Sequence, residues 1–237
     1  NNYRQVVVRA SLEAAVSRIN LHLPVAAVGQ AIAIVSKPES LDTVISNRGF
    51  HRLLLDGVPV VYKRDDEVIH DHAFAIDFTD LQANRFRAIN QFTIQGSKQL
   101  RRPDIICFIN GLPLAVLELK SPTAENVDIW DAFNQIQTYK DEVPDLFAYN
   151  EAVVVSDGYN ARVGSLTANQ ERFMPWRTIK HEDDKPLLDW QLETMVRGFF
   201  DRELFLDYLR YFVIFETDSE RLIKKIAGYH QFHAVRE

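Results

Sequence analysis

Residues 103–120 constrain the fold more than any other segment, because two apolar runs, PDIICFI and PLAVLELK, flank the dipeptide Asn110-Gly111. Asn-Gly between apolar runs is the strongest short-range signal for a β-hairpin, since both residues accept the positive φ angles of a tight turn. We therefore predict a hairpin whose two strands enter a largely apolar sheet.

Charged residues stand at the far ends of these two strands: Asp104 on the first, and Glu118 and Lys120 on the second. Side chains two positions apart on a strand leave the same face, so Glu118 and Lys120 form one polar pair. Such a pair taken alone is most often a surface ion pair. Charges that enter an apolar sheet need partners or a metal ion, and this context favours a cation site.

The register of the hairpin decides whether Asp104 can join the pair. With a simple two-residue turn, Glu118 would face Pro103 and Asp104 would lie on the opposite face of the sheet. A three-residue loop at 110–112, a five-residue loop at 109–113 or a β-bulge would place Asp104 directly opposite Glu118. Two carboxylates would then be close enough to bind one divalent ion. We therefore predict an odd-length loop or a bulge.

The rest of the chain indicates a mixed α and β fold. Helices are expected over 3–20, 40–56 and 128–142, and strands over 58–64, 72–78, 86–96 and 152–158. After Pro175 the chain becomes polar and then strongly helical to about residue 213. We expect one domain over residues 1–180 and a helical linker over 181–237.

Composition limits the classes of function. The net charge of −6 argues against a protein that coats DNA without regard to sequence. A local basic group, Lys98, Arg101 and Arg102, precedes the hairpin, and we take Arg101 and Arg102 as candidate DNA contacts. The single cysteine, Cys107, excludes an internal disulfide and indicates a cytoplasmic setting.

Other segments bear on localisation and completeness. The longest apolar stretches fall far short of a membrane span, so no membrane association is expected. No GxxxxGK[ST] loop occurs, so this chain should not hydrolyse ATP. The chain starts without Met and stops in AGYHQFHAVRE, which indicates a fragment of a longer protein.

Several strings together resemble a known family. RRPDIICFINGLPLAVLELKSP resembles the PD-(D/E)xK nuclease motif, and FNQIQTYK resembles the QxxxY motif of its RecB-like branch, with Gln135 and Tyr139 on one helical face. With NQFTIQG before them and SDGYNARVGSLTANQERFMPWRTI after them, residues 40–237 resemble the N-terminal endonuclease region of type I restriction R subunits (HsdR). The implied fold is α/β and restriction-endonuclease-like, with a mixed central sheet flanked by helices and helical segments at both ends.

The resemblance also implies a mechanism, in which Mg²⁺ is bound by Asp104, Glu118 and the backbone carbonyl of Leu119. Lys120 would orient the attacking water and stabilise charge on the phosphate. Gln135 and Tyr139 would support the site or contact DNA. The implied activity is that of a type I site-specific deoxyribonuclease, limited here to its nuclease domain.

Partners follow from the same resemblance: double-stranded DNA, the methylation and specificity subunits of the restriction complex, and the protein's own motor domain, which uses ATP in the full-length subunit. The tail GYHQFHAV resembles the opening of that motor domain, which would make Tyr229 and Gln231 adenine contacts. An ordinary helix start is an equally good interpretation of this tail.

Other candidates are weaker. Glu13 and Asp77 are weak candidates for an additional acidic ligand, and His70 and His72 lack a third zinc ligand, so we predict no zinc site. Alternative functions are a non-catalytic coupling and DNA-binding module of a motor subunit, or a RecB-like exonuclease or junction resolvase with the same core. A two-carboxylate glycosidase is remote because it would not require the adjacent lysine.

Overall fold

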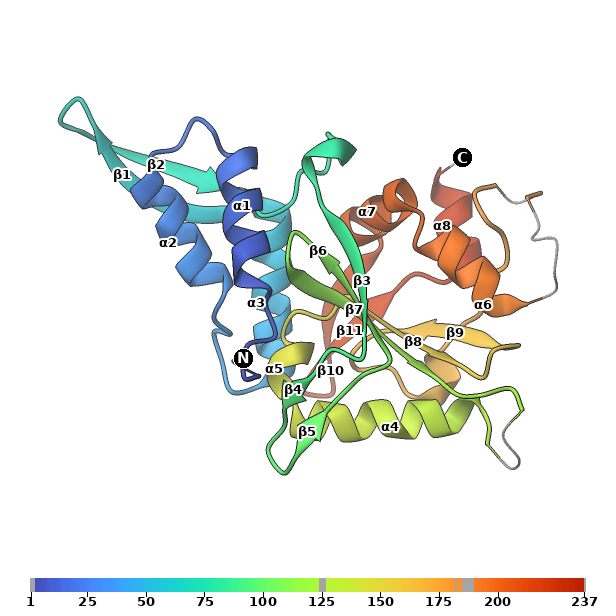
Figure 1. The fold of residues 1–237 in the computed structure, drawn as a ribbon. Helices are drawn as coiled ribbons and strands as arrows, with labels where there is room; N and C mark the ends of the chain where they lie inside the picture. Colours follow the sequence, from blue (N-terminus) through green and yellow to red (C-terminus); the bar gives the residue numbers. More distant parts are fainter. Residues whose placement is uncertain (1–2, 124–126, 182, 185–189, 237) are drawn as a thin grey trace.

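The structure, a computed structural model, describes residues 3–123, 127–181, 183–184 and 190–236. A five-stranded sheet lies at its centre, with the strand order β3-β6-β7-β8-β9 (Figure 1). The strands are β3 (Phe86–Asn90), β6 (Ile105–Ile109), β7 (Leu112–Leu119), β8 (Ala152–Ser156) and β9 (Ala161–Gly164). β7 and β8 run parallel, whereas the other neighbours are antiparallel, so the sheet is mixed.

The central strands are buried on both faces, which explains their nearly continuous apolar sequences. Every residue of β8, and every residue of β7 before Leu119, is buried. Helix α4 (Ile129–Glu142) packs against β7 and β8. It begins at a capping box in which Asp128 and Asp131 satisfy backbone N–H groups of the first turn, as expected from the acidic start of this segment. Its buried residues are Ile129, Ala132, Phe133, Ile136, Tyr139 and Glu142.

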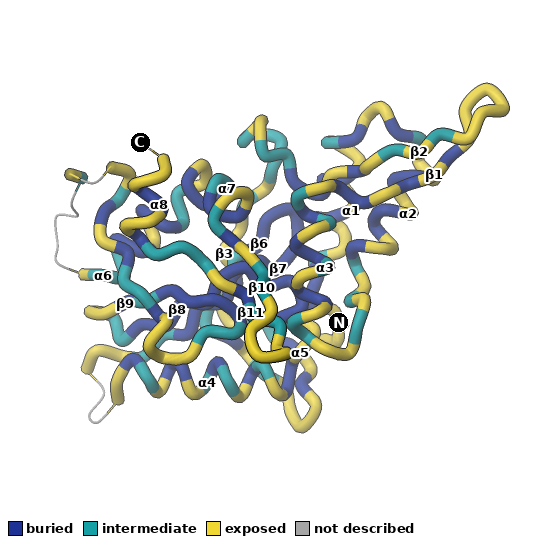
Figure 2. Tube along the Cα trace, turned by 180° about the vertical axis from the view of Figure 1, so that it is seen from behind, coloured by how far each residue is buried: buried dark blue, intermediate teal, exposed yellow. Residues whose placement is uncertain are grey.

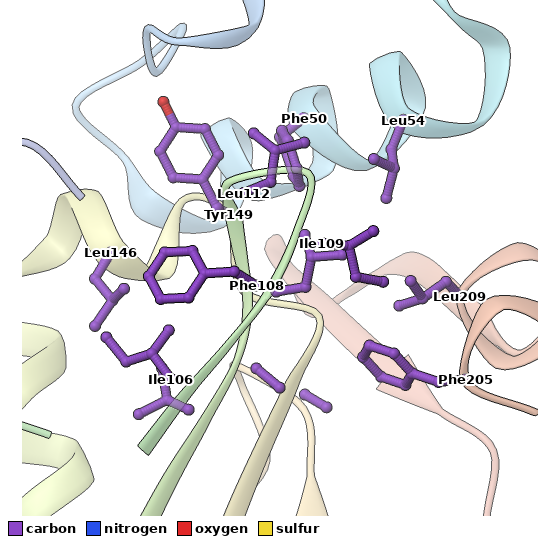
Figure 3. Packing of buried hydrophobic residues seen from close by; sticks show 14 of the residues in the cluster. Phe50, Leu54, Ile106, Phe108, Ile109, Leu112, Leu146, Tyr149, Phe205 and Leu209 are labelled. Carbon is purple, nitrogen blue, oxygen red and sulfur yellow. The ribbon is translucent and has the colours of Figure 1, made fainter. Parts of the chain in front are cut away.

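Helices from distant parts of the chain complete the core. Buried side chains of α3 (Thr43–Asp56), α5 (Pro144–Phe147) and α7 (Arg202–Tyr211) join those of the sheet in one apolar cluster. Figure 3 shows Phe205 and Leu209 of α7 in the same region as Ile109 of β6, and Leu146 of α5 near Ile106.

The N-terminal part contains α1 (Arg9–Ile19), α2 (Val25–Val35) and α3, followed by the hairpin of β1 (Val58–Arg64) and β2 (Glu67–Ala73). This hairpin projects from the body and its tip is exposed (Figures 1 and 2). The expected strand at 72–78 is wrong except at its first two residues, since β2 ends at Ala73. Helix α2 was not predicted, because VAAVGQAIAIV is apolar nearly all round and shows no clear polar face.

The C-terminal part is helical, as expected, but it also contains a hairpin that was not predicted. Short helical turns α6 (Gln191–Thr194) and η3 (Met195–Phe199) precede α7, and the predicted helix ends at Tyr211. Strands β10 (Val213–Asp218) and β11 (Arg221–Ile226) follow, and α8 (Tyr229–Arg236) comes last. The remaining short elements are η1 (Leu81–Ala83), β4 (Ile94–Gln95), β5 (Leu100–Arg101) and η2 (Gln170–Arg172).

The mixed central sheet with helices on its flanks is the fold that the sequence predicted, a restriction-endonuclease-like α/β architecture. Among the helices in the described part of the chain, none combines the length and apolar character that a membrane span requires.

Candidate active site

A β-bulge brings the acidic residues of the hairpin together. Asn110 and Gly111 form a two-residue turn with φ angles of 52° and 85°, and Phe108 pairs with Pro113. The next pair is Cys107 with Ala115, so Leu114 is an extra residue on β7. This shift continues to Ile105 and Leu117, and its extension places Asp104 opposite Glu118. The prediction of an odd-length loop or a bulge is therefore confirmed. The turn itself has two residues, and a bulge shifts the register.

The carboxylate of Asp104 is held from two sides. Its Oδ1 accepts a hydrogen bond of 2.9 Å from the side-chain amide of Gln91, and its Oδ2 accepts one of 2.8 Å from the backbone N–H of Leu119. Gln91 follows β3 at the point where β3 and β6 stop pairing. One donor therefore comes from the residue after β3 and the other from the last residue of β7, the two strands that flank β6.

Glu118 is a buried acid with an unsatisfied oxygen. The residue is 2% exposed, and its Oε2 is buried without a hydrogen-bond partner. Burial and then the charge of Asp104 raise the pKa of Glu118 to about 7, although Lys120 and the backbone N–H of Asp104 act in the opposite direction. A buried carboxylate with one unpartnered oxygen, next to a second acid, is costly unless a cation neutralises the pair.

Lys120 connects this acid to helix α4. Its Nζ lies 3.4 Å from Oε1 of Glu118 and donates a shorter hydrogen bond of 2.7 Å to Oε1 of Gln135. The Nε2 of Gln135 in turn donates to the hydroxyl of Tyr139 at 2.6 Å. Burial, together with the charges of Glu118 and Asp104, raises the pKa of Tyr139 to about 12, so its hydroxyl stays protonated. The structure thus brings the two sequence motifs together.

The two candidate arginines differ. Arg101 makes a two-pronged ion pair with Glu142 at the end of α4, with donor distances of 2.6 and 2.5 Å. This ion pair occupies Nε and one terminal nitrogen, Nη2, of the guanidinium. Arg102 is exposed. A DNA contact by either arginine stays a prediction.

The residues at the site fit a hard divalent cation. Carboxylate and carbonyl oxygens are the ligands that Mg²⁺ prefers, and Asp104, Glu118 and the carbonyl of Leu119 supply both kinds. The unpartnered Oε2 of Glu118 is the observation that such an ion would explain. Within the described residues, no group of three or more His, Cys, Asp or Glu side chains could hold a metal, so the candidate site depends on two carboxylates.

The remaining candidates lie in other environments. Glu13 forms an ion pair with Arg9, and Asp77 accepts hydrogen bonds from Thr79 and Asp80 in a turn. His70 and His72 lie two apart on β2 of the projecting hairpin.

The tail residues are also engaged within the chain. Tyr229 is 5% exposed, and its hydroxyl lies 2.9 Å from the hydroxyl oxygen of Thr178. Oε1 of Gln231 accepts a hydrogen bond from the backbone N–H of Gly228. Their nucleotide-binding role stays a prediction, and it would require Tyr229 to leave this packing.

Sequence reasoning found Asp104, Glu118, Lys120, Gln135 and Tyr139, which the structure places in one connected site. It missed the partners Gln91 and Glu142. Gln91 lies within the quoted segment NQFTIQG, but neither its spacing nor its residue type indicates a contact with Asp104.

The fold and this site define a class of α/β domain in which two carboxylates and a lysine gather on a bulged hairpin beside a Gln-xxx-Tyr helix. The chain belongs to the family described as the type I restriction enzyme R protein N terminus, which matches residues 1–172. This match extends further toward the N-terminus than the resemblance over 40–237.

Relatives support the same assignment. The chain is 44% identical over 236 residues to the type I restriction enzyme HindI endonuclease subunit of Haemophilus influenzae, covering 98% of this chain and 22% of that protein. A putative MjaIXP endonuclease subunit of Methanocaldococcus jannaschii is 28% identical over 255 residues, covering 100% of this chain and 24% of the relative. The SsaAORF53P endonuclease subunit of Staphylococcus saprophyticus is 30% identical over 203 residues, with 83% and 20% covered. The chain thus spans less than a quarter of these relatives.

Proposed function

We propose that this chain is the nuclease domain of a type I restriction R subunit and cleaves DNA phosphodiester bonds endonucleolytically with Mg²⁺. The observation that carries the proposal is the bulge that aligns Asp104 with Glu118 beside Lys120. Relatives named as endonuclease subunits support it. Family membership favours this function over that of an exonuclease or a junction resolvase.

Asp104, Glu118 and the backbone carbonyl of Leu119 are the groups that would hold the metal. Bound there, Mg²⁺ supplies a Lewis acid for the scissile phosphate and lowers the pKa of water, a contribution of several kcal/mol. The chain's own part is to hold these oxygens in place. Asp104 is fixed by two donors, and Glu118 by its burial in β7.

Lys120 is the residue that would act on the nucleophile and the phosphate. Its ammonium group is shared between the amide oxygen of Gln135 and the carboxylate of Glu118, and the amide contact is the shorter one. Gln135 therefore keeps Lys120 from closing into a tight ion pair. A positively charged donor held in this way can orient a water molecule and stabilise charge that develops on phosphate oxygens.

The substrate that we propose is double-stranded DNA, and the proposed setting is the cytoplasm. The net charge of −6 leaves little general attraction to DNA, so we assign most of the DNA binding to the rest of the complex. The other proposed parts of this complex are the methylation and specificity subunits and the protein's own motor domain, which uses ATP. Exposed basic residues near the hairpin, such as Lys98 and Arg102, would contribute locally.

The experiment that tests the proposal compares cleavage by the assembled complex in Mg²⁺ and in EDTA, for wild type, Lys120→Ala and Lys63→Ala. Lys63 is an exposed lysine on the projecting strand β1 and serves as the matched control. We expect Lys120→Ala to lose cleavage by at least about a hundredfold while DNA binding and ATP hydrolysis persist. Cleavage by Lys120→Ala at the wild-type rate would instead favour a non-catalytic coupling module.

A further inference from the structure

Gln91 has an unusual backbone conformation for its place in the fold. Its φ angle is +52°, in the left-handed region that few residues other than glycine adopt. The other described non-glycine residues with positive φ, namely Asp65, Asp66, Asn110, Ser219 and Glu220, all lie in two-residue hairpin turns. Gln91 instead lies between β3 and β4, which belong to different sheets. Hairpin geometry therefore does not account for its conformation.

This conformation directs two donors of Gln91 to a single residue. The backbone N–H donates to the carbonyl oxygen of Asp104 at 3.0 Å, and the side-chain amide donates to Oδ1 of Asp104 at 2.9 Å. Strained backbone persists where surrounding contacts hold it, and it concentrates at functional sites. The contacts that accompany the strain here are both with Asp104.

The effect on the Asp104 carboxylate is to fix its plane. Gln91 binds Oδ1 and the backbone N–H of Leu119 binds Oδ2, so rotation about the last side-chain bond would break both hydrogen bonds. Both donors are neutral amides, so they leave the carboxylate with its full charge for a cation. An arginine or lysine in place of Gln91 would compete with the metal instead.

A purely structural role explains this contact poorly. The Gln91 side chain is exposed, so water competes for its amide and the hydrogen bond contributes little to folding. The main effect of this hydrogen bond is to orient the carboxylate of Asp104.

We propose that Gln91 is a positioning residue of the metal site, which holds Asp104 in the orientation that binds the divalent ion. The inference rests on the proposed function, because it needs Asp104 to be a metal ligand. The role assigned to Gln91 acts through Asp104, the residue that both of its donors contact. Its loss should therefore weaken metal binding more than it slows cleavage once metal is saturating.

The test uses the full-length protein in its assembled complex with Gln91→Met, which keeps the size of the side chain and removes its donor. Gln95→Met is the matched control, because within the described residues the Gln95 side-chain amide donates only to the neighbouring Gly96 carbonyl. Two quantities are measured: the Mg²⁺ concentration that gives half-maximal cleavage, and Mn²⁺ binding by calorimetry. The Mn²⁺ binding assigned to this site is the binding that is lost in Asp104→Asn.

We expect Gln91→Met to raise the half-saturating Mg²⁺ concentration by about 10- to 100-fold and to weaken Mn²⁺ binding comparably. Cleavage at saturating Mg²⁺ should return to within a few-fold of wild type, and Gln95→Met should behave as wild type. An unchanged Mg²⁺ requirement in Gln91→Met, or lost cleavage with unchanged Mn²⁺ binding, would overturn the inference. If Asp104→Asn keeps both cleavage and Mn²⁺ binding, the proposed function itself fails and the inference falls with it.

Discussion

The backbone N–H of Leu119 donates a 2.8 Å hydrogen bond to Oδ2 of Asp104, across the two strands of the central hairpin. This contact depends on the register that the extra residue Leu114 creates, because without the bulge Asp104 would lie one position away on the other face. The bulge therefore sets the geometry of the proposed metal site. β-bulges commonly re-aim side chains next to active sites.

We expect Glu118→Gln to stabilise the metal-free protein. Burial and the charge of Asp104 raise the pKa of Glu118 from 4.5 to about 7. The unfolded state therefore loses its proton first, and the free energy of unfolding falls as pH rises from about 4.5 to about 7, then levels off. At pH 8 in EDTA, Glu118→Gln should raise the free energy of unfolding by up to about 3 kcal/mol. Below about pH 4.5 this advantage should disappear.

Glu142→Gln serves as the control with the opposite sign. The hydrogen bond and charge of Arg101 hold the pKa of Glu142 below its usual value, despite partial desolvation. Its contribution to stability is present above pH 4.5 and is lost as pH falls through the lower, folded pKa. At pH 8, Glu142→Gln should therefore destabilise the protein. Urea unfolding from pH 4 to 8 measures both variants, and the same sign for both would contradict the assignment.

Gly111→Ala should destabilise the fold. Gly111 has a φ of +85°, and an added Cβ would lie 2.5 Å from the carbonyl oxygen of Val8, whose own N–H donates to the Gly111 carbonyl. Strain and collision should lower the free energy of unfolding by roughly 2 kcal/mol or more.

Gly29→Ala is the matched control for this change. Gly29 lies inside helix α2 and an added Cβ would meet nothing within 4 Å, so alanine should stabilise by about 0.5–1 kcal/mol. Chemical denaturation compares the two variants. Equal effects would show that the turn does not depend on glycine.

The sequence predicted the site better than it predicted the peripheral elements, for a physical reason. Asn110-Gly111 and the two apolar runs predicted the hairpin from local sequence. Its register was predicted by requiring the carboxylates of Asp104 and Glu118 to lie on the same face of the sheet. The helix formers and the acidic first turn of 128–142, with Pro144 after them, likewise predicted α4 to within one residue. Short-range sequence patterns suffice where turn chemistry and burial agree.

The missed features depend on contacts between distant residues. Gln91 meets Asp104, and Arg101 meets Glu142, through tertiary pairing that no local spacing encodes. The hairpin β10–β11 was missed because it follows a long helical run, whose apparent continuation hid the change of pattern at Phe212. Periodicity cannot show which distant segment a polar side chain will reach.

Gln135→Ala should reduce cleavage by about tenfold or more at saturating Mg²⁺. Without the Gln135 oxygen, Lys120 should move from its 2.7 Å amide contact into a closer ion pair with Glu118. Tyr139→Phe should have a smaller effect, because it removes only the acceptor of the Gln135 amide.

Gln137→Ala provides the control on the same helix, since the Gln137 amide oxygen accepts a hydrogen bond from Lys140 and takes no part in the site. Single-turnover cleavage measures all three variants. If Gln135→Ala and Gln137→Ala cleaved equally fast, the link from Lys120 to α4 would have no role in the reaction.

Lys224→Met should destabilise the protein strongly, because Lys224 is a fully buried cation that connects three distant segments. Its Nζ donates to Glu151 Oε2 at 2.6 Å, to the Asn150 carbonyl at 2.8 Å and to Asn47 Oδ1 at 3.0 Å. Burial disfavours the charge of Glu151, but Lys224 and His51 outweigh it and hold the pKa of Glu151 below its usual value. Removing one partner leaves a buried, poorly compensated charge, at a cost of about 3–5 kcal/mol.

The neighbouring lysine offers a control for this prediction. Lys225 forms an ion pair with Glu216 across the same hairpin, but both side chains are exposed, so Lys225→Met should change stability by less than about 1 kcal/mol. Urea unfolding of both variants, of Glu151→Gln and of Lys224→Met/Glu151→Gln gives the coupling between the Lys224 and Glu151 charges. The double variant should recover part of the loss, since its buried carboxylate is gone. Similar losses for Lys224→Met and Lys225→Met would show that this buried pair does not hold the hairpin β10–β11 to α3 and to the residues just before β8.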